Sequence, residues 1–386
     1  MAYRYGAWRG GPDPLAPPFD ARSLLDELGT DVLDGASPRE ALRALLRRGS
    51  GRMRGLDSLR RQVRERMRET RDRGRLDGTL EEVRRLLDRA LELERQALFP
   101  DPSDAARLAE SELDGVPADT ARAVRQLADY PWRSPAAAQA YAEIRDLLRR
   151  EVLDAQFHGL KDMLRNGSAQ DVSRVRDMLA DLNAMLDADA AGADTAEAFQ
   201  QFMDDYGDLF PEAPESLEEL VDVLARRAAA ASRLMASLTP DQRAELSSLL
   251  AAALDDADLR LEMDRLAAAL RGRRPDLGWD ARERMTGDEP LGVGDATTAL
   301  ADLADLGDLD AALRQDYAGA SLEDVDADAL ARAVGQRAVD DLGALRAVER
   351  ELAEQGYLAR NAGELELTPK AVRRLGSSAL ARIFGS

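Results

Sequence analysis

Apolar residues recur every three or four positions over most of this 386-residue chain, which is the spacing of one face of an α-helix. From Leu56 the apolar residues form one narrow stripe, and arginines cover the rest of that segment. The stripe continues through Leu59, Val63 and Met67. A second stripe runs through Val172, Val175, Leu179, Leu182 and Leu186. The pattern predicts a body of several helices over residues 36–271.

The starts of several helices are marked by a serine or threonine followed three positions later by glutamate or glutamine, the pattern of a capping box. We expect helices to begin at four such places: Ser37 with Glu40, Thr79 with Glu82, Ser216 with Glu219, and Thr239 with Gln242. Ser134–Pro135 predicts a further start, of a long helix that ends at Asn166–Gly167.

Glycine and proline interrupt the helical pattern in two stretches. Residues 6–20 read GAWRGGPDPLAPPFD, which is too rich in both for a helix, so residues 1–35 are predicted to be an N-terminal arm. Residues 272–294 contain Pro275, Gly278, Gly287, Pro290, Gly292 and Gly294. Loops of this length are uncommon inside a compact domain, and we therefore place a domain boundary there.

The C-terminal residues 295–386 hold the one strand pattern of the sequence. A predicted helix ending at Gln355 runs into Gly356-Tyr357-Leu358, and after a turn at 361–363 Leu365 and Leu367 alternate with polar residues. Thr368–Pro369 then marks the start of a last helix. With helices expected at 326–334 and 339–355, this order is that of a winged helix-turn-helix.

The composition favours helix over strand. Apolar residues make up 45% of the chain, but aromatic residues only 4%, and alanine, leucine, arginine and glutamate are strong helix formers. The sequence therefore predicts an all-α fold: a multi-helix body with a small C-terminal winged-helix-like segment.

The sequence offers no recognisable catalytic or metal-binding motif. There is no cysteine, and the single histidine, His158, has no Glu-x-x-His arrangement. The pair Gly292 and Gly294 has no third glycine, and no Gly-Lys-Ser/Thr phosphate loop occurs. An EF-hand beginning at Asp187 fails because Ala198 stands where the last ligand must be. We expect no enzyme, no cofactor and no metal; a carboxylate hydrolase would require converging acids in a deep pocket.

Charge is distributed unevenly along the chain. Residues 39–75 hold fourteen arginines and five acids, whereas residues 177–264 hold twenty-one acids and five arginines, and the net charge is −20. No apolar run approaches the roughly 18 residues of a membrane-spanning helix, and no signal-peptide pattern follows Met1. The sequence therefore predicts a cytoplasmic protein with no membrane contact.

The arginine-rich helix around 52–75 is the best candidate for binding nucleic acid, but it contains no aromatic residue and the rest of the chain is acidic. Pairing with acids, either of this protein or of a partner, explains these arginines better. The predicted recognition helix of the winged-helix segment is also acidic, with Asp340, Asp341, Glu349 and Glu351. We therefore expect it to contact protein rather than nucleic acid.

Five segments carry a resemblance to a known family. They are residues 3–20, 99–107 (FPDPSDAAR), 119–135 (DTARAVRQLADYPWRSP), 288–297 (DEPLGVGDAT) and 355–376 (QGYLARNAGELELTPKAVRRLG). In these segments the chain resembles the N-terminal region of actinobacterial von Willebrand factor A (VWA) domain proteins associated with MoxR or magnesium-chelatase-type AAA+ ATPases. The VWA domain of that family, with its Asp-x-Ser-x-Ser metal site, has no counterpart here, so no metal ligand is carried over.

The resemblance implies an adaptor or scaffold that binds a MoxR or chelatase-type AAA+ ATPase, with a VWA domain acting in cis or in trans. The expected contact residues are Arg60, Arg61, Arg64 and Arg68 of the arginine helix, and Gly292, Gly294 and Asp295 of the loop. The alternative at these positions is internal: the arginines pair with acids of this chain and the loop only packs. The alternative function is a winged-helix regulator that binds nucleic acid and has a large helical sensor domain.

Overall fold

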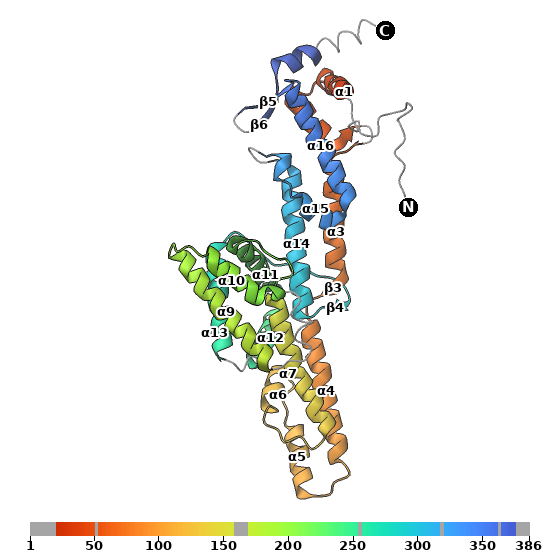
Figure 1. Ribbon diagram of the computed structural model, residues 1–386. Coiled ribbons are helices and arrows are strands. Elements are labelled where there is room, and N and C mark those ends of the chain that lie inside the picture. Colours follow the sequence, from red (N-terminus) through yellow and green to blue (C-terminus); the bar gives the residue numbers. More distant parts are fainter. Residues whose placement is uncertain are drawn as a thin grey trace, which may run out of the picture. The chain divides into compact units, whose positions relative to one another are not determined.

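The structure is a computed structural model and describes residues 21–50, 53–157, 169–253, 257–316, 320–361 and 364–375 (Figure 1). Most of these residues are helical, and the described strands form only two-stranded sheets, which confirms the predicted all-α fold. Residue contacts divide the chain into two compact units. Unit 1 comprises Met1–Glu69 and Asp305–Ser386, and unit 2 comprises Thr70–Ala304.

Unit 1 combines segments from both ends of the chain. Its elements are α1 (Ala21–Leu33), α2 (Pro38–Arg48), β1 (Gly49–Ser50), β2 (Met53–Arg54), most of α3 (Leu56–Arg73), the second part of α14 (Val293–Arg314), η3 (Leu322–Asp324), α15 (Ala327–Val334), α16 (Gln336–Glu354), β5 (Leu358–Asn361) and β6 (Glu364–Leu367). Leu28 of α1, Leu59 of α3 and Leu345 of α16 are fully buried in one shared core. The apolar stripe predicted from Leu56 thus packs against residues near the other end of the chain.

The C-terminal part of unit 1 has the predicted helix, helix, hairpin, helix order. Strands β5 and β6 pair antiparallel, with Leu358 opposite Leu367. Residues 369–375 are helical, and the Thr368 hydroxyl accepts a hydrogen bond from the Ala371 amide at 3.3 Å, as expected of an N-cap. The predicted winged-helix-like arrangement is therefore present in the described residues.

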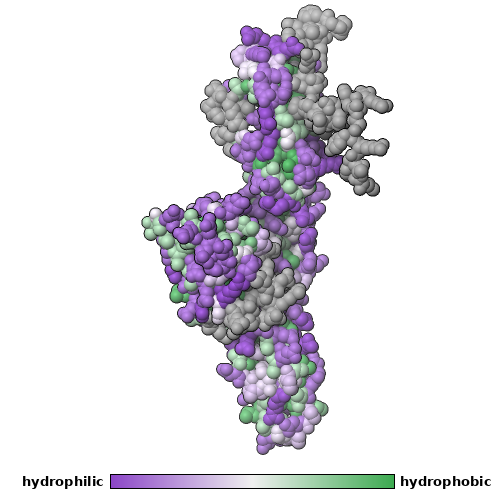
Figure 2. All heavy atoms as spheres, in the orientation of Figure 1, coloured by the Kyte–Doolittle hydropathy of each residue, from purple (hydrophilic) through white to green (hydrophobic). Residues whose placement is uncertain are grey.

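Unit 2 holds the middle of the chain. Its elements are the end of α3, β3 (Gly74–Arg75), α4 (Gly78–Leu98), α5 (Asp104–Asp114), α6 (Thr120–Gln126), α7 (Pro135–Gln156), α9 (Ala169–Ala190), α10 (Ala196–Tyr206), η2 (Gly207–Leu209), α11 (Leu217–Ser237), α12 (Pro240–Ala253), α13 (Ala257–Arg273), β4 (Glu289–Pro290) and the first part of α14. Helix α4 packs along α7, and α9, α11 and α13 enclose an apolar core that includes Leu182, Leu224 and Leu270. Figure 2 shows mainly hydrophilic residues on the outer side of these helices.

Most of the predicted helix starts are confirmed. The hydroxyls of Ser37, Ser216 and Thr239 each accept a hydrogen bond from the backbone amide three positions on. Ser134 does the same for Ala137 at the start of α7. Helix α7 ends at Gln156, before the predicted end at Asn166–Gly167, which lies outside the described residues.

The capping box predicted at Thr79 is wrong. Helix α4 begins earlier, at Gly78, and no side chain caps its start. The Thr79 hydroxyl instead accepts a hydrogen bond, at 3.0 Å, from the backbone amide of Val293, a residue far away in the sequence. Glu82 instead pairs with Arg85 on the same helix.

Two short strand pairs have no signal in the sequence. Strand β3 pairs in parallel with β4, which joins Gly74 to Glu289 within unit 2. Strands β1 and β2 form a small antiparallel pair in unit 1. Two-residue strands are too short for an alternating apolar pattern, so periodicity does not reveal them.

The contacts divide the chain inside α3 and inside α14, whereas the boundaries predicted from the sequence lie after residues 35, 271 and 294. Glycine and proline mark where elements end, but not which distant segments share a core. Helix α1 lies within the predicted arm 1–35, while the Gly/Pro-rich residues 6–20 lie outside the described residues. Among the helices of the described ranges, none is long and apolar enough to cross a membrane.

Candidate functional site

Two of the four predicted contact arginines are engaged inside unit 1. Arg60 and Arg64 both direct their guanidinium groups at the carboxylate of Asp310, with Nε to Oδ1 distances of 3.2 and 2.9 Å. Their Nη2 atoms lie 3.3 and 3.2 Å from Oδ2, so each contact is bidentate. Burial alone raises the pKa of Asp310, but the hydrogen bonds from Arg60 and Arg64 outweigh it and hold the pKa below its ordinary value.

The other two arginines, Arg61 and Arg68, are exposed. Neither has an ion pair or side-chain hydrogen bond among the residues that the structure describes. They differ from Arg60 and Arg64 in their partners, because Arg60 and Arg64, one helical turn apart, both reach Asp310. The structure therefore separates the predicted set into two arginines that pair with Asp310 and two that have no such partner among the described residues.

The glycines of the loop 288–297 lie close to two acids of α7. The Gly294 amide donates a hydrogen bond to Glu151 Oε2 at 3.0 Å. A Cβ atom at Gly292 would lie 2.7 Å from Glu151 Oε1, and one at Gly294 would overlap the carboxylate of Asp154. Both glycines therefore let the backbone approach α7 within unit 2, and a side chain at either position would require the Glu151 or Asp154 carboxylate to shift.

The rest of this loop is held by backbone contacts. Gly78 donates a hydrogen bond to the Leu291 carbonyl at 3.0 Å, and Leu291 donates to the Arg75 carbonyl at 2.9 Å. Asp295 is exposed and lies in the first turn of α14, where a carboxylate favours the helix N-terminus. Of the three loop residues predicted to contact a partner, Asp295 is the one with a side chain beyond glycine, and it is exposed.

A buried carboxylate that the sequence analysis did not single out organises the segment 119–135. Glu94 of α4 is fully buried and accepts hydrogen bonds from the backbone amides of Arg133 and Ser134 at 2.8 and 2.9 Å. The Tyr130 hydroxyl lies 3.5 Å from the same carboxylate, and burial, followed by the charge of Glu94, raises the pKa of Tyr130 to about 12. Glu94 thus fixes the entry of the chain into α7.

Tyr130 and Trp132 of the same segment form a ring cluster with Tyr141 of α7. The Trp132 ring lies 5.0 Å from Tyr130 and 5.3 Å from Tyr141, measured between ring centroids. The Tyr141 hydroxyl donates a hydrogen bond to the Val124 carbonyl. The sequence shows only that Glu94 lies on the apolar side of a predicted helix. That position does not identify the groups that its carboxylate binds.

The acids that failed the EF-hand pattern pair with arginines of α13. Asp187 lies 2.8 Å from Arg265, and Asp189 lies 2.7 Å from Arg273. Within the described ranges, no group of three or more histidine, cysteine or acidic side chains is arranged to hold a metal ion. His158 lies outside the described residues.

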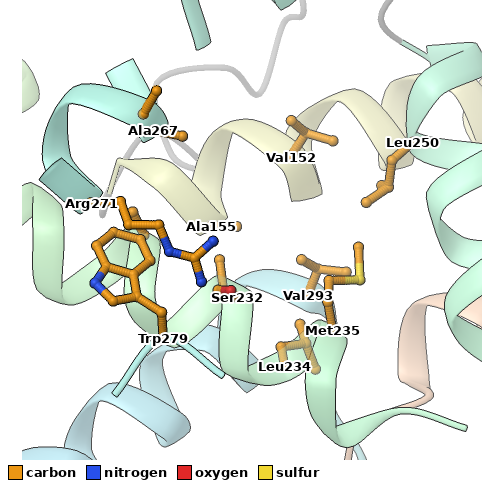
Figure 3. A pocket seen from close by; sticks show the side chains of 13 residues that line it. Val152, Ala155, Ser232, Leu234, Met235, Leu250, Ala267, Arg271, Trp279 and Val293 are labelled. Carbon is orange, nitrogen blue, oxygen red and sulfur yellow. The ribbon is translucent and has the colours of Figure 1, made fainter. Parts of the chain in front are cut away.

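Unit 2 contains an apolar cavity of about 490 Å³ between α7, α11 and α13. Figure 3 shows Arg271 beside Trp279, with its guanidinium directed toward Ser232, while Val152 and Leu250 line another part of the cavity. The Arg271 guanidinium carbon lies 5.2 Å from the centre of the Trp279 ring, and its Nη2 pairs with Asp280 at 2.9 Å. Among the described residues that line it there is no carboxylate, so in this part of the chain the cavity lacks the converging acids of a hydrolase.

The winged-helix-like segment presents mixed charge in unit 1. Arg346 of α16 donates to the carbonyls of Leu322 and Val325, and Lys370 donates to the Gln355 carbonyl. Both cations are thereby engaged within unit 1. Arg373 and Arg374 are exposed after the hairpin, while Arg382 lies outside the described residues.

Comparison with known proteins identifies homologues over almost the whole chain. Residues 77–147, from the start of α4 into α7, match the Mb0984 helical domain. The chain is 48% identical over 378 residues to the uncharacterized proteins Mb0984 of Mycobacterium bovis and Rv0959 of Mycobacterium tuberculosis. The match covers 98% of this chain and 56% of the length of these relatives. No solved structure matches the chain significantly. The chain is therefore a homologue of the mycobacterial proteins Mb0984 and Rv0959.

Proposed function

We propose that this chain is a non-catalytic protein-interaction module, an adaptor or scaffold for an AAA+ ATPase of the MoxR or magnesium-chelatase type. In this proposal the ATPase hydrolyses ATP, and a VWA domain, in cis or in trans, supplies a further contact. The resemblance of the five sequence segments suggests the partner. The structural observation that supports an interaction role is the exposed pair Arg61 and Arg68.

These two arginines suit the edge of a protein interface. Their charges are not neutralised by a carboxylate among the described residues, whereas Arg60 and Arg64 share Asp310. Exposed complementary charges speed association and select partners more than they add affinity. The binding should therefore weaken as salt screens the charges.

The test is co-elution of the purified chain with the ATPase, with ATP, with ADP and without nucleotide. We expect binding in at least one state, and a loss of roughly ten-fold in affinity when Arg61→Glu and Arg68→Glu are combined, as expected for a few rim charges in an interface. The matched control combines Arg60→Glu and Arg64→Glu, which should lower thermal stability first because both residues pair with Asp310.

Two outcomes would contradict this proposal. One is a folded chain at micromolar concentration that does not co-elute with the ATPase in any nucleotide state, also after a VWA domain is added. The other is an unchanged affinity after charge reversal at Arg61 and Arg68, which would remove the structural support.

The alternative, a nucleic-acid-binding regulator, is favoured by the winged-helix-like order and by the exposed Arg373 and Arg374. Against it, the net charge of −20 opposes approach to a polyanion. Submicromolar binding of duplex DNA at physiological salt, lost in Arg373→Glu with Arg374→Glu, would establish this alternative.

A further inference from the structure

The most exposed large apolar side chain among the described residues lies at the turn between α4 and α5. The Phe99 side chain directly follows α4 and is 87% exposed, and Leu108 of α5 is 63% exposed. Figure 2 shows hydrophobic residues at the surface, among hydrophilic ones, in the region where Figure 1 places α5. A phenylalanine this exposed contributes little to the core of its own unit.

The exposure of Phe99 is built into an ordered turn. The preceding residue, Leu98, is fully buried, and the Phe99 amide donates to the Arg95 carbonyl at 2.9 Å. The Asp101 amide donates to the Leu98 carbonyl at 2.9 Å, and the Asp101 carboxylate accepts from the Ser103 amide at 3.0 Å. These bonds fix the backbone on both sides of the ring.

Further contacts hold the turn against the rest of unit 2. The Asp101 carboxylate pairs with the guanidinium of Arg133 at 2.6 Å, and the backbone amide of the same Arg133 binds the buried Glu94. Pro100 and Pro102 restrict the backbone on either side of Asp101. An aromatic side chain on a backbone that is already ordered loses little entropy when it binds, which is the property of an interface anchor.

The charges near this turn are mainly negative. Residues 95–114 contain five acids and two arginines: Asp101, Asp104, Glu110, Glu112, Asp114, Arg95 and Arg107. Asp101 and Asp114 have arginine partners in the structure, the latter at 3.8 Å. Asp104, Glu110 and Glu112 have no ion pair with an arginine among the described residues, and together with Arg107 they leave the segment negatively charged.

We propose that the α4–α5 turn is a docking surface, in which Phe99 inserts into an apolar pocket of a partner protein whose rim carries lysine or arginine side chains. Leu108 of α5 is a second exposed apolar side chain in this part of the chain. A second copy of the same turn fits poorly, because two negatively charged segments would repel each other. Anionic membrane surfaces are disfavoured for the same reason. The proposal deepens the proposed function, since the AAA+ ATPase is the partner on which it is tested.

The first experiment compares Phe99→Ser with the wild-type chain in binding to the ATPase. Removing a central aromatic anchor should weaken binding roughly thirty-fold, and Leu108→Ser should weaken it less. The matched control is Leu261→Ser, another exposed leucine of unit 2, at 57% exposure, which should leave the affinity within about two-fold of wild type, as expected outside an interface. All three variants should melt like the wild type, because the replaced side chains are exposed.

The second experiment uses the absence of cysteine from the chain. A single Phe99→Cys carries an environment-sensitive fluorophore, and Leu261→Cys carries the same label as the control. Binding of the ATPase should shift the emission of the label at position 99 to shorter wavelength, because the label enters an apolar pocket. The label at position 261 should not respond.

The outcomes separate this inference from the function on which it rests. If the wild-type chain binds the ATPase and Phe99→Ser binds equally tightly, the docking surface is refuted and the adaptor function stands. If the wild-type chain does not bind, both fail. A label at position 99 that responds to neutral phosphatidylcholine vesicles but not to the ATPase would also refute the protein docking surface, in favour of a lipid contact.

Discussion

Arg64 and Asp310 are 246 positions apart in the chain, and the Nε atom of Arg64 lies 2.9 Å from Oδ1 of Asp310. This contact, together with that of Arg60, joins α3 to α14 within unit 1. The arginine-rich helix was expected either to meet a partner or to pair with acids of its own chain. In the structure, Arg60 and Arg64 pair with an acid of their own chain, Asp310.

Asp310→Asn should destabilise unit 1. The side chain of Asp310 is only 12% exposed, and its loss of charge leaves Arg60 and Arg64 facing a neutral amide. We expect the free energy of unfolding to fall by about 1 to 2 kcal/mol, because the Arg64 side of the pair is half exposed and screened by solvent. Chemical denaturation followed by circular dichroism measures this.

The control for this change is Asp308→Asn, at an exposed position of the same helix. It should alter the stability by less than about 0.5 kcal/mol, as is usual at the surface. Equal stability of Asp310→Asn and wild type would show that the two arginines do not depend on this carboxylate.

The stabilisation by Asp310 should also depend on pH. Because the folded-state pKa of Asp310 lies below its ordinary value, the folded protein holds the charged form more strongly than the unfolded chain does. The contribution is therefore fully present above the ordinary pKa of about 4 and is lost as the pH falls through the lower folded pKa. The difference in stability between wild type and Asp310→Asn should be constant near neutral pH and shrink below about pH 4. A difference that grows on acidification would contradict this assignment.

Gly294→Ala and Gly307→Ala should act in opposite directions although both residues belong to α14. A Cβ atom at position 294 would overlap the Asp154 carboxylate, so we expect a loss of about 1 to 3 kcal/mol. At position 307 nothing lies within 4 Å, and alanine should stabilise the helix by up to about 1 kcal/mol. Thermal unfolding of both variants, monitored by calorimetry, tests the pair. Similar effects at the two positions would mean that the loop is not packed on α7 as described.

Glu94→Ala should destabilise unit 2 strongly. The change removes the acceptor for the amides of Arg133 and Ser134 in a buried place, at a cost of about 2 to 4 kcal/mol. Glu92→Ala, on the exposed side of the same helix, is the control and should have little effect. Hydrogen exchange of the Arg133 and Ser134 amides gives a second measurement. Unchanged protection of these amides in Glu94→Ala would refute the role of the carboxylate.

Local signals in the sequence predicted the helices well. The caps at Ser37, Ser216 and Thr239 involve residues three positions apart, and a capping box therefore records them directly. The prediction failed at Thr79 because its hydroxyl binds the amide of Val293, which is 214 positions away. A local pattern carries no information about such a partner.

The sequence likewise predicted only part of the candidate site. The excess of arginine in residues 39–75 was visible, but not that Arg60 and Arg64 share Asp310 while Arg61 and Arg68 remain exposed. Gly292 and Gly294 were expected either to contact a partner or to pack internally; that they pack against Glu151 and Asp154 was not visible in the sequence. The charge and the glycine content of a segment can be read from its sequence. The partner of each side chain depends on which distant segments the fold brings together.

Because residues from both ends of the chain form the core of unit 1, this core can be completed only late in synthesis. Residues 21–63 leave the ribosome first, but the residues they pack against, from Leu306 to Leu375, are made only after the whole of unit 2. At typical bacterial rates this delay is on the order of ten seconds or more, during which the apolar stripe of α3 has no native cover. Unit 2 is contiguous and has all its own residues at that time. The helices of residues 21–63 therefore complete their packing only after the C-terminal helices emerge.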